Sequence, residues 1–150
     1  MSEGRQLCTF FVDDLYLGVD VLEVQEVVRY QDLTAVPLAP EAVRGLINLR
    51  GQIVTAIDMR TMLGLAPLDG DELPVNVVIR DGVDEAASLL VDQIGDVVDT
   101  ADLELEEVPP TLVGAARELV LGAYKLADRL LLVLDTAPVL AVQTIVPARG

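Results

Sequence analysis

The feature that most constrains the fold of this chain is an internal repeat of a short apolar pattern. Both copies run from a Gly through an apolar segment, a tight turn and a second apolar segment to an Asp, and end on a Leu. The second copy lies 77 positions after the first. Its matched positions are Gly45, Leu49, Ile53, Val54, Ile57, Asp58, Met62 and Leu63 with Gly122, Leu126, Leu130, Leu131, Leu134, Asp135, Val139 and Leu140. Agreement in register at a Gly and an Asp favours a duplicated unit over chance alternation.

Two upstream pairs extend the repeat with a shorter offset. Val19-Asp20 and Val36-Pro37 recur 72 positions later as Val91-Asp92 and Val108-Pro109. The second copy therefore carries a small insertion near residues 111–121. We expect one domain over residues 1–150, built from two similar subdomains at about 15–80 and 85–141. Units of this size bury too little surface to be comfortably stable alone, so the two should share a core.

Most of the apolar segments are short, β-branched and closed by turn residues, which is typical of strands. A short amphipathic helix is expected at 21–26, and further short helices at 40–44, 59–63 and 136–141. The expected extended segments are 7–13, 15–20, 27–36, 46–50, 52–58, 75–80, 87–91, 97–101, 119–126 and 129–135. So many short strands with so few helices predict an all-β fold, either a sandwich or small barrels.

Charge and composition exclude several classes of function. The chain has 10 Lys and Arg against 25 Asp and Glu, a formal net charge of −15, which disfavours binding to nucleic acid or to an anionic membrane surface. The charge is spread evenly along the chain, so it indicates solubility. The N-terminus lacks a signal-type pattern and no apolar run approaches 18 residues, so we expect a cytoplasmic protein without direct membrane insertion.

An enzyme is hard to build from these residues. His is absent, Cys8 is the only cysteine, and no Gly-rich phosphate loop is present. We expect Cys8 to be a buried apolar residue, and Asp58 and Asp135 to cap the short helices that follow them. The acidic stretch 102–107 alternates with apolar residues, as in an edge strand or ordered loop, and lacks the spacing of a calcium loop. We therefore predict no catalytic residues, no cofactor and no metal site.

Two segments remain unexplained by packing. In the segment 21–28, Leu22 and Glu26 would share one face of a helix, with three valines on another. In Asn48-Leu49-Arg50-Gly51, an Arg stands at the tip of an expected hairpin in a chain with few cations. Such an Arg either pairs with a nearby carboxylate or is a solvated turn residue.

These segments carry a family resemblance. Val24-Gln25-Glu26-Val27, Pro37-x-x-Pro40, Val43-x-Gly45-Leu46-Ile47-Asn48-Leu49-Arg50-Gly51-Gln52-Ile53-Val54 and Ile57-Asp58-Met59-Arg60 resemble the CheW family of chemotaxis coupling proteins. The segments at 89–94 and 122–132 are similar to its second half, and the resemblance covers residues 6–141. The Asn-Leu-Arg-Gly block is also typical of the homologous regulatory domain of CheA kinases, but the chain ends without a kinase segment.

The resemblance implies two intertwined five-stranded SH3-like β-barrels and a noncatalytic adaptor. Such adaptors couple the cytoplasmic tip of methyl-accepting chemoreceptors to the regulatory domain of a CheA-type histidine kinase. They are recruited from the cytoplasm to membrane receptor arrays, where CheW-to-CheW contacts also form. By position, Val24 and Gly45 match sites associated with kinase binding.

Five further residues are expected at or near the receptor groove. Glu26, Val27 and Arg50 match positions near the groove between the subdomains, and we predict that Glu26 and Arg50 form an ion pair that holds this region in shape. Apolar side chains around Val27, Val97 and Val98 would supply a groove for a receptor helix. The alternative, that these valines only hold the barrels together, stays open.

Some positions depart from the family pattern. Thr55 stands where Pro is usual, and residues 115–119 in the inserted stretch have no clear counterpart. Three other functions remain open: a diverged paralogue that binds only receptor or only kinase in another motility or chemosensory system, a β-barrel that binds an apolar small molecule between the subdomains, and, as the weakest, an enzyme that uses carboxylates alone.

Overall fold

The computed structural model describes residues 5–68, 72–81 and 85–142. Its elements, in chain order, are β1 (Gln6–Val12), β2 (Leu15–Asp20), the 3-10 helix η1 (Val21–Glu23), β3 (Val24–Val28), β4 (Val43–Leu49), β5 (Gln52–Asp58), α1 (Met59–Met62), β6 (Val75–Asp81), β7 (Glu85–Val91), β8 (Gln93–Asp99), α2 (Gly114–Glu118), β9 (Val120–Lys125), β10 (Leu130–Leu134) and α3 (Thr136–Ala141). The all-β fold with a few short helices is confirmed.

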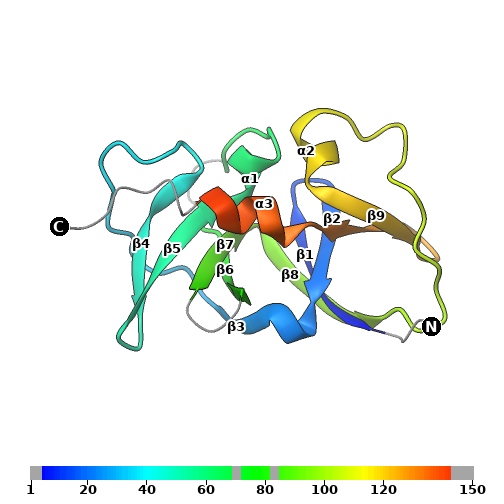
Figure 1. Ribbon diagram of the computed structural model, residues 1–150, viewed down its shortest axis with the longest axis horizontal. Helices are drawn as coiled ribbons and strands as arrows, with labels where there is room; N and C mark the ends of the chain where they lie inside the picture. Colours follow the sequence, from blue (N-terminus) through cyan, green and yellow to red (C-terminus); the bar gives the residue numbers. More distant parts are fainter. Residues whose placement is uncertain (1–4, 69–71, 82–84, 143–150) are drawn as a thin grey trace.

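The strands form two five-stranded sheets that lie on opposite sides of the view in Figure 1. The first, sheet A, has the order β8-β1-β2-β10-β9, and the second, sheet B, has the order β3-β6-β7-β5-β4. Each contains one parallel pair, β10 with β2 in sheet A and β5 with β7 in sheet B, among antiparallel neighbours. The chain begins in sheet A, builds all of sheet B, and returns to sheet A at β8. The barrels are therefore intertwined.

One hydrophobic core joins the two sheets, as the sequence predicted. The main cluster contains Phe10 and Leu17 from sheet A, Ile57 and Leu89 from sheet B, and Val139 from α3, all of them fully buried. In Figure 1, α3 lies in the middle of the view between the two sets of strands. Each sheet also has a smaller cluster of its own, around Leu131 and Val133 in sheet A and around Ile47 and Val54 in sheet B. Cys8, which was expected to be buried, is half-buried and packs against the main cluster. This burial raises the pKa of its thiol.

The two sheets share local features at positions that the sequence repeat matches. Asp58 caps α1 by accepting hydrogen bonds from the N–H groups of Arg60 and Thr61, and Asp135 caps α3 by accepting one from Ala137. Both caps were predicted. Each sheet also has an isolated bridge beside a repeat glycine, Thr34 with Leu46 and Glu106 with Ala123. These parallels support the duplication, which stays a prediction.

Two predicted helices were wrong and one helix was missed, while the extended segments expected at 27–36 and 97–101 correspond to β3, which ends at Val28, and to β8, which spans Gln93–Asp99. The predicted helix at 21–26 is a single 3-10 turn followed by β3, because the β-branched run from Val24 pairs along β6. The predicted helix at 40–44 is a turn that leads into β4, which begins at Val43 opposite Ile57. The helix α2 was not predicted; its N-terminus has no side-chain cap and so no start signal. It lies within the inserted stretch at 111–121.

Candidate functional site

Five of the candidate partner-binding residues lie on two edge strands, one in each sheet, while Gly45 lies in β4 and Arg50 at the tip of the β4–β5 hairpin. β3 carries Val24, Glu26 and Val27 at the edge of sheet B, and β8 carries Val97 and Val98 at the edge of sheet A. Edge strands leave one row of backbone groups and one set of side chains free for a partner. The 3-10 helix η1 joins β2 of sheet A to β3 of sheet B and contacts both β1 and β6.

The valines on these edges differ in exposure. Val27 and Val97 are 41% and 57% exposed, so both offer apolar surface to a partner. Val98 instead packs against the small cluster of sheet A around Leu7, and Val24 packs against the main core. The structure therefore brings Val27 and Val97 to the surface, while Val24 and Val98 have packing roles of their own.

Glu26 and Arg50 form the ion pair that the sequence predicted. Arg50 Nη1 lies 2.6 Å from Glu26 Oε1, which connects β3 to the tip of the β4–β5 hairpin. The tip is a two-residue turn in which Arg50 and Gly51 both have positive φ, 54° and 85°. The Gly51 N–H donates to Asn48 Oδ1 at 2.9 Å and closes the turn. Because the Arg50 side chain is mostly exposed, the pair is a modest contribution to stability and chiefly orients the two groups.

The backbone of β4 requires a glycine at position 45. Its φ is +154°, and a Cβ there would lie 2.6 Å from the carbonyl oxygen of Thr34. That carbonyl accepts a hydrogen bond from the Leu46 N–H at 2.8 Å, and the Thr34 N–H donates back to the Leu46 carbonyl. Gly45 is also buried, so it could affect a kinase surface only through the shape of β4.

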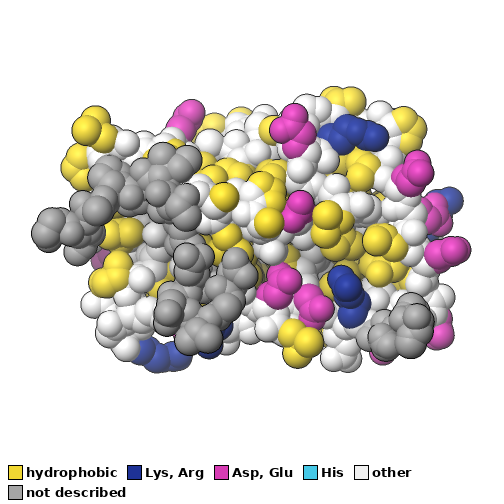
Figure 2. Space-filling view, viewed as in Figure 1, with side chains coloured by type: hydrophobic (Ala, Val, Ile, Leu, Met, Phe, Trp, Pro, Cys, Tyr) yellow, Lys and Arg dark blue, Asp and Glu magenta, His cyan; other side chains and the backbone are white. Residues whose placement is uncertain are grey.

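A hollow lies beside the end of β8. It has a volume of about 480 Å³ and is lined by Arg5, Gln6, Asp20, Val21, Leu22, Asp99 and Ala101. Leu22 in η1 is almost fully exposed there, although the helical face it was predicted to share with Glu26 does not form. Acidic side chains are spread over the face seen in Figure 2.

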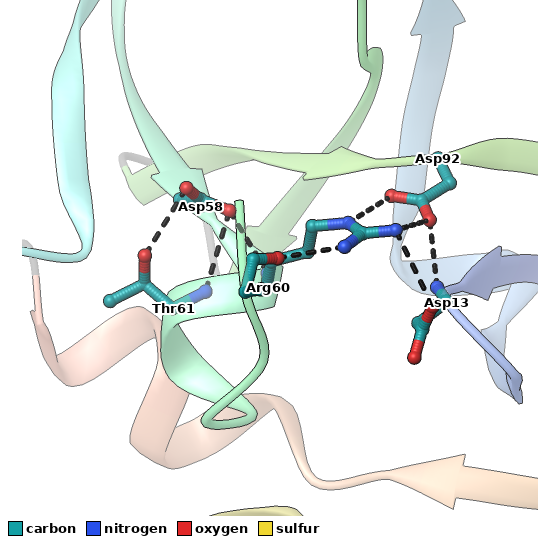
Figure 3. Close-up of polar contacts among 6 residues, drawn as sticks. Asp13, Asp58, Arg60, Thr61 and Asp92 are labelled. Carbon is teal, nitrogen blue, oxygen red and sulfur yellow. Dashed lines mark hydrogen bonds and ion pairs between the residues drawn. The ribbon is translucent and has the colours of Figure 1, made fainter. Parts of the chain in front are cut away.

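A polar junction that the sequence analysis missed connects the two sheets (Figure 3). Asp92 lies between β7 of sheet B and β8 of sheet A, and accepts hydrogen bonds from Arg60 Nε at 3.0 Å and Arg60 Nη2 at 2.6 Å. The backbone N–H of Asp13, in the β1–β2 turn, donates to Asp92 Oδ2 at 2.7 Å. Arg60 Nη1 donates to the Ala66 carbonyl at 2.7 Å.

The junction is electrostatically well matched. Burial alone would raise the pKa of Asp92, but the hydrogen bonds from Arg60 and from the Asp13 N–H outweigh it, so the pKa lies below its ordinary value. The hydrogen bond to Asp92 raises the pKa of Arg60, against the opposing effect of burial. Both groups are therefore charged at neutral pH. Two partial signals of the junction were present in the sequence, since Asp92 belongs to the repeat and Arg60 to a family motif.

Within the described residues, no group of three or more His, Cys, Asp or Glu side chains is placed to hold a metal ion. None of the helices in this part of the chain is long and apolar enough to cross a membrane.

Comparisons with known proteins agree on one family. Residues 6–144 match the model of the CheW-like domain. The chain is 31% identical to the chemotaxis protein CheW of Treponema pallidum (strain Nichols) over 137 residues, 89% of this chain and 81% of that protein. It is 29% identical to the chemotaxis protein CheW of Klebsiella aerogenes over 138 residues, 92% of this chain and 82% of that protein. The crystal structure of the scaffolding protein TtCheW from Thermoanaerobacter tengcongensis matches with a TM-score of 0.76 and 25% identity, covering 88% of this chain and 89% of that one.

Proposed function

The chain belongs to the CheW-like domain family of noncatalytic chemotaxis adaptors, and from this premise we propose that it couples methyl-accepting chemoreceptors to a CheA-type histidine kinase. In this role it works in the cytoplasm and is recruited to membrane receptor arrays. Its two partners are the cytoplasmic tip of the receptor and the regulatory domain of the kinase, and contacts with further copies of the chain extend the array.

The observation that supports the proposal best is the distribution of the candidate residues over the two sheets. The residues assigned to the kinase, Val24 and Gly45, both lie in sheet B. The residues assigned to the receptor lie on both edges, with Glu26, Val27 and Arg50 at sheet B and Val97 and Val98 at sheet A. A coupling protein needs two surfaces on one rigid body, and the shared core supplies that rigidity.

The receptor surface has the chemistry of helix-in-groove recognition. An amphipathic helix binds by placing apolar side chains against an apolar strip while its polar side chains remain at the rim. The exposed Val27 and Val97 are the apolar anchors, and the Glu26–Arg50 pair is the polar rim beside Val27. Val98, which points to the other face of β8, packs against the small cluster of sheet A and so anchors this strand.

The test is co-sedimentation with the receptor's cytoplasmic signalling fragment and the CheA-type kinase of the same genome, each alone and then together. We expect a ternary complex in which autophosphorylation of the kinase rises only when this chain is present. If only one partner is retained, the chain is the diverged paralogue that binds receptor or kinase alone. If neither is retained, the coupling proposal is wrong. The next candidate is then apolar-ligand binding in the hollow of about 500 Å³ that Phe11, Tyr16, Leu112 and Leu132 help to line.

A matched pair of variants tests the receptor surface. Val97→Asp places a charge on the exposed face of β8, and Leu121→Asp does the same on β9, at the opposite edge of sheet A. The two side chains are 57% and 58% exposed, so the variants should be destabilised equally little. We expect Val97→Asp to lose the receptor fragment and Leu121→Asp to retain it. Equal retention by both would remove Val97 from the receptor surface.

A further inference from the structure

The chain crosses from sheet B back to sheet A at one residue, Asp92. β7 ends at Val91 in sheet B and β8 begins at Gln93 in sheet A, so Asp92 alone lies between them. The Asp92 N–H donates to the carbonyl oxygen of Phe11 in β1 at 2.9 Å, which fixes the backbone of the crossover to sheet A. Its side chain faces α1, which follows β5 of sheet B (Figure 3).

The side chain of Asp92 binds groups from both sheets at once. Its Oδ1 and Oδ2 accept from Nε and Nη2 of Arg60 in α1, and Oδ2 also accepts from the N–H of Asp13 in the β1–β2 turn. Asp13 has a positive φ of 56°, a conformation that such a hydrogen bond helps to hold. Arg60 Nη2 is also 3.7 Å from Asp13 Oδ1, which adds a direct ion pair across the junction.

This arrangement is more directional than the core that it accompanies. The hydrophobic effect that joins the sheets has no preferred direction of its own, so a directional contact further defines their relative angle. A two-pronged Arg–carboxylate pair fixes the planes of both groups. The side chains of Arg60 and Asp92 are only 15% and 16% exposed, so solvent screens the pair much less than it screens Glu26–Arg50.

The repeat does not supply a second such pair. At the offset of 77 residues, the position that matches Arg60 is Ala137. The backbone N–H of Ala137 donates to Asp135, just as the backbone N–H of Arg60 donates to Asp58. At the offset of 72, the position that matches Asp92 is Asp20, which accepts from the N–H of Leu22. Helix capping therefore explains the backbone of Arg60 but not its side chain.

We propose that Arg60 is a positioning residue that locks the orientation of sheet A relative to sheet B by holding Asp92 at the crossover. β8 begins at the next residue, so the lock also fixes the edge strand that carries Val97 and Val98. This last consequence rests on the proposed function, since it matters only where a partner contacts both edges. The orientation itself is a property of the free protein.

The test is pulsed dipolar EPR on the free chain in a Cys8→Ala background. One pair of spin labels spans the sheets, on Ile53→Cys of β5 and Leu121→Cys of β9, both at exposed positions. A second pair lies within sheet A, on Val97→Cys and Leu121→Cys. We expect a single narrow distance distribution for both pairs in the parent. Arg60→Gln should broaden or shift the distribution of the pair that spans the sheets and leave the pair within sheet A unchanged.

Three further variants separate positioning from general destabilisation. Arg44→Gln removes one positive charge from the Arg44–Asp58 pair, whose two members both lie in sheet B, and should leave both distributions unchanged. Asp92→Asn should reproduce Arg60→Gln, and serves as the second variant if Arg60→Gln does not fold. Arg60→Lys should stay closer to Arg60→Gln than to the parent, because an ammonium group cannot form the two-pronged pair.

All EPR spectra are recorded under conditions in which urea titration shows the variants to be folded, so that a changed distance distribution reports sheet orientation and not unfolding. If neither Arg60→Gln nor Asp92→Asn changes the distance across the sheets, or if both label pairs change together, the proposal is wrong. In the reconstituted complex, Arg60→Gln should then lower kinase stimulation at saturating partner concentrations. If the parent itself gives no stimulation, the proposed function fails while the EPR result still decides the orientation.

Discussion

Substituting Ala for a glycine can destabilise the fold in two ways, by an unfavourable positive φ and by a collision of the new Cβ. Three glycines of this chain allow the two effects to be measured apart. Gly45 has both a positive φ of 154° and a collision, since its Cβ would lie 2.6 Å from the Thr34 carbonyl. Gly122 has only the collision, 2.7 Å from the Glu106 carbonyl, and Gly51 has only a positive φ, 85°, with nothing within 4 Å. Substituting Ala at each position should therefore rank Gly45 as the most sensitive.

The expected magnitudes follow from those contacts. An unfavourable φ in a non-Gly residue costs about 1–3 kcal/mol. The collision at Gly45 has to move residue 34, which exchanges two backbone hydrogen bonds with Leu46, at about 0.5–1.5 kcal/mol each. Gly45→Ala should thus cost about 2–6 kcal/mol, against about 1–3 for Gly51→Ala. Gly122→Ala disturbs the matching pair of bonds between Glu106 and Ala123, for about 1–3 kcal/mol.

Urea unfolding followed by far-UV circular dichroism measures these differences, with the slope m compared among variants to check that unfolding stays two-state. The reasoning fails if Gly45→Ala costs no more than Gly51→Ala, because the collision with the Thr34 carbonyl would then have no energetic effect. The same series matters for function. A kinase-binding defect in a Gly45 variant is informative only if the variant is folded under the conditions of the binding assay.

Two further predictions concern the ion pairs. A double-mutant cycle with Glu26→Gln and Arg50→Gln should give a coupling energy of about 0.3–1 kcal/mol that shrinks at high salt; a value below about 0.3 would leave the pair no role in holding the hairpin tip. Asp92 has a lowered folded-state pKa, so its stabilisation should be complete above the unfolded value near 3.8 and lost as the pH falls through the folded-state value. The stability difference between the parent and Asp92→Asn should accordingly be constant near neutral pH and shrink in acid, which urea titrations across that range would measure; a difference independent of pH would contradict it.

Most of the strand pattern could be predicted because it depends on local periodicity and turn chemistry. The strand expected at 52–58 has the bounds of β5, and those expected at 15–20 and 75–80 agree within one residue. Where local signals compete with pairing, sequence reasoning failed. In the segment 21–26, Leu22 and Glu26 have the spacing of residues on one face of a helix. From Val24 onward, however, the chain pairs with β6 and forms a strand, because that edge offers backbone hydrogen bonds.

The candidate site was predictable only in part. The Glu26–Arg50 pair could be anticipated because family motifs mark both residues, although the position of Arg50 at an expected hairpin tip was equally compatible with a solvated side chain. The junction of Arg60, Asp92 and Asp13 could not, since it joins residues 32 and 79 positions apart across two sheets. No local pattern reports such a contact, and each of its residues has an ordinary explanation alone: Arg60 on a short helix, Asp13 in a turn and Asp92 after a strand.

The two halves of the predicted repeat share some features and differ in others. Features that both halves share, such as the glycine beside a bridging carbonyl and the Asp that caps a helix, serve folding in each sheet. The long-range ionic contacts do not repeat. At the repeat offsets, Glu26 and Arg50 match Val98 and Ala127, and Arg60 matches Ala137. Within the described residues, neither the Glu26–Arg50 pair nor the Arg60–Asp92 pair has a counterpart at the repeat offsets, so both lie outside the set of features that the two sheets share.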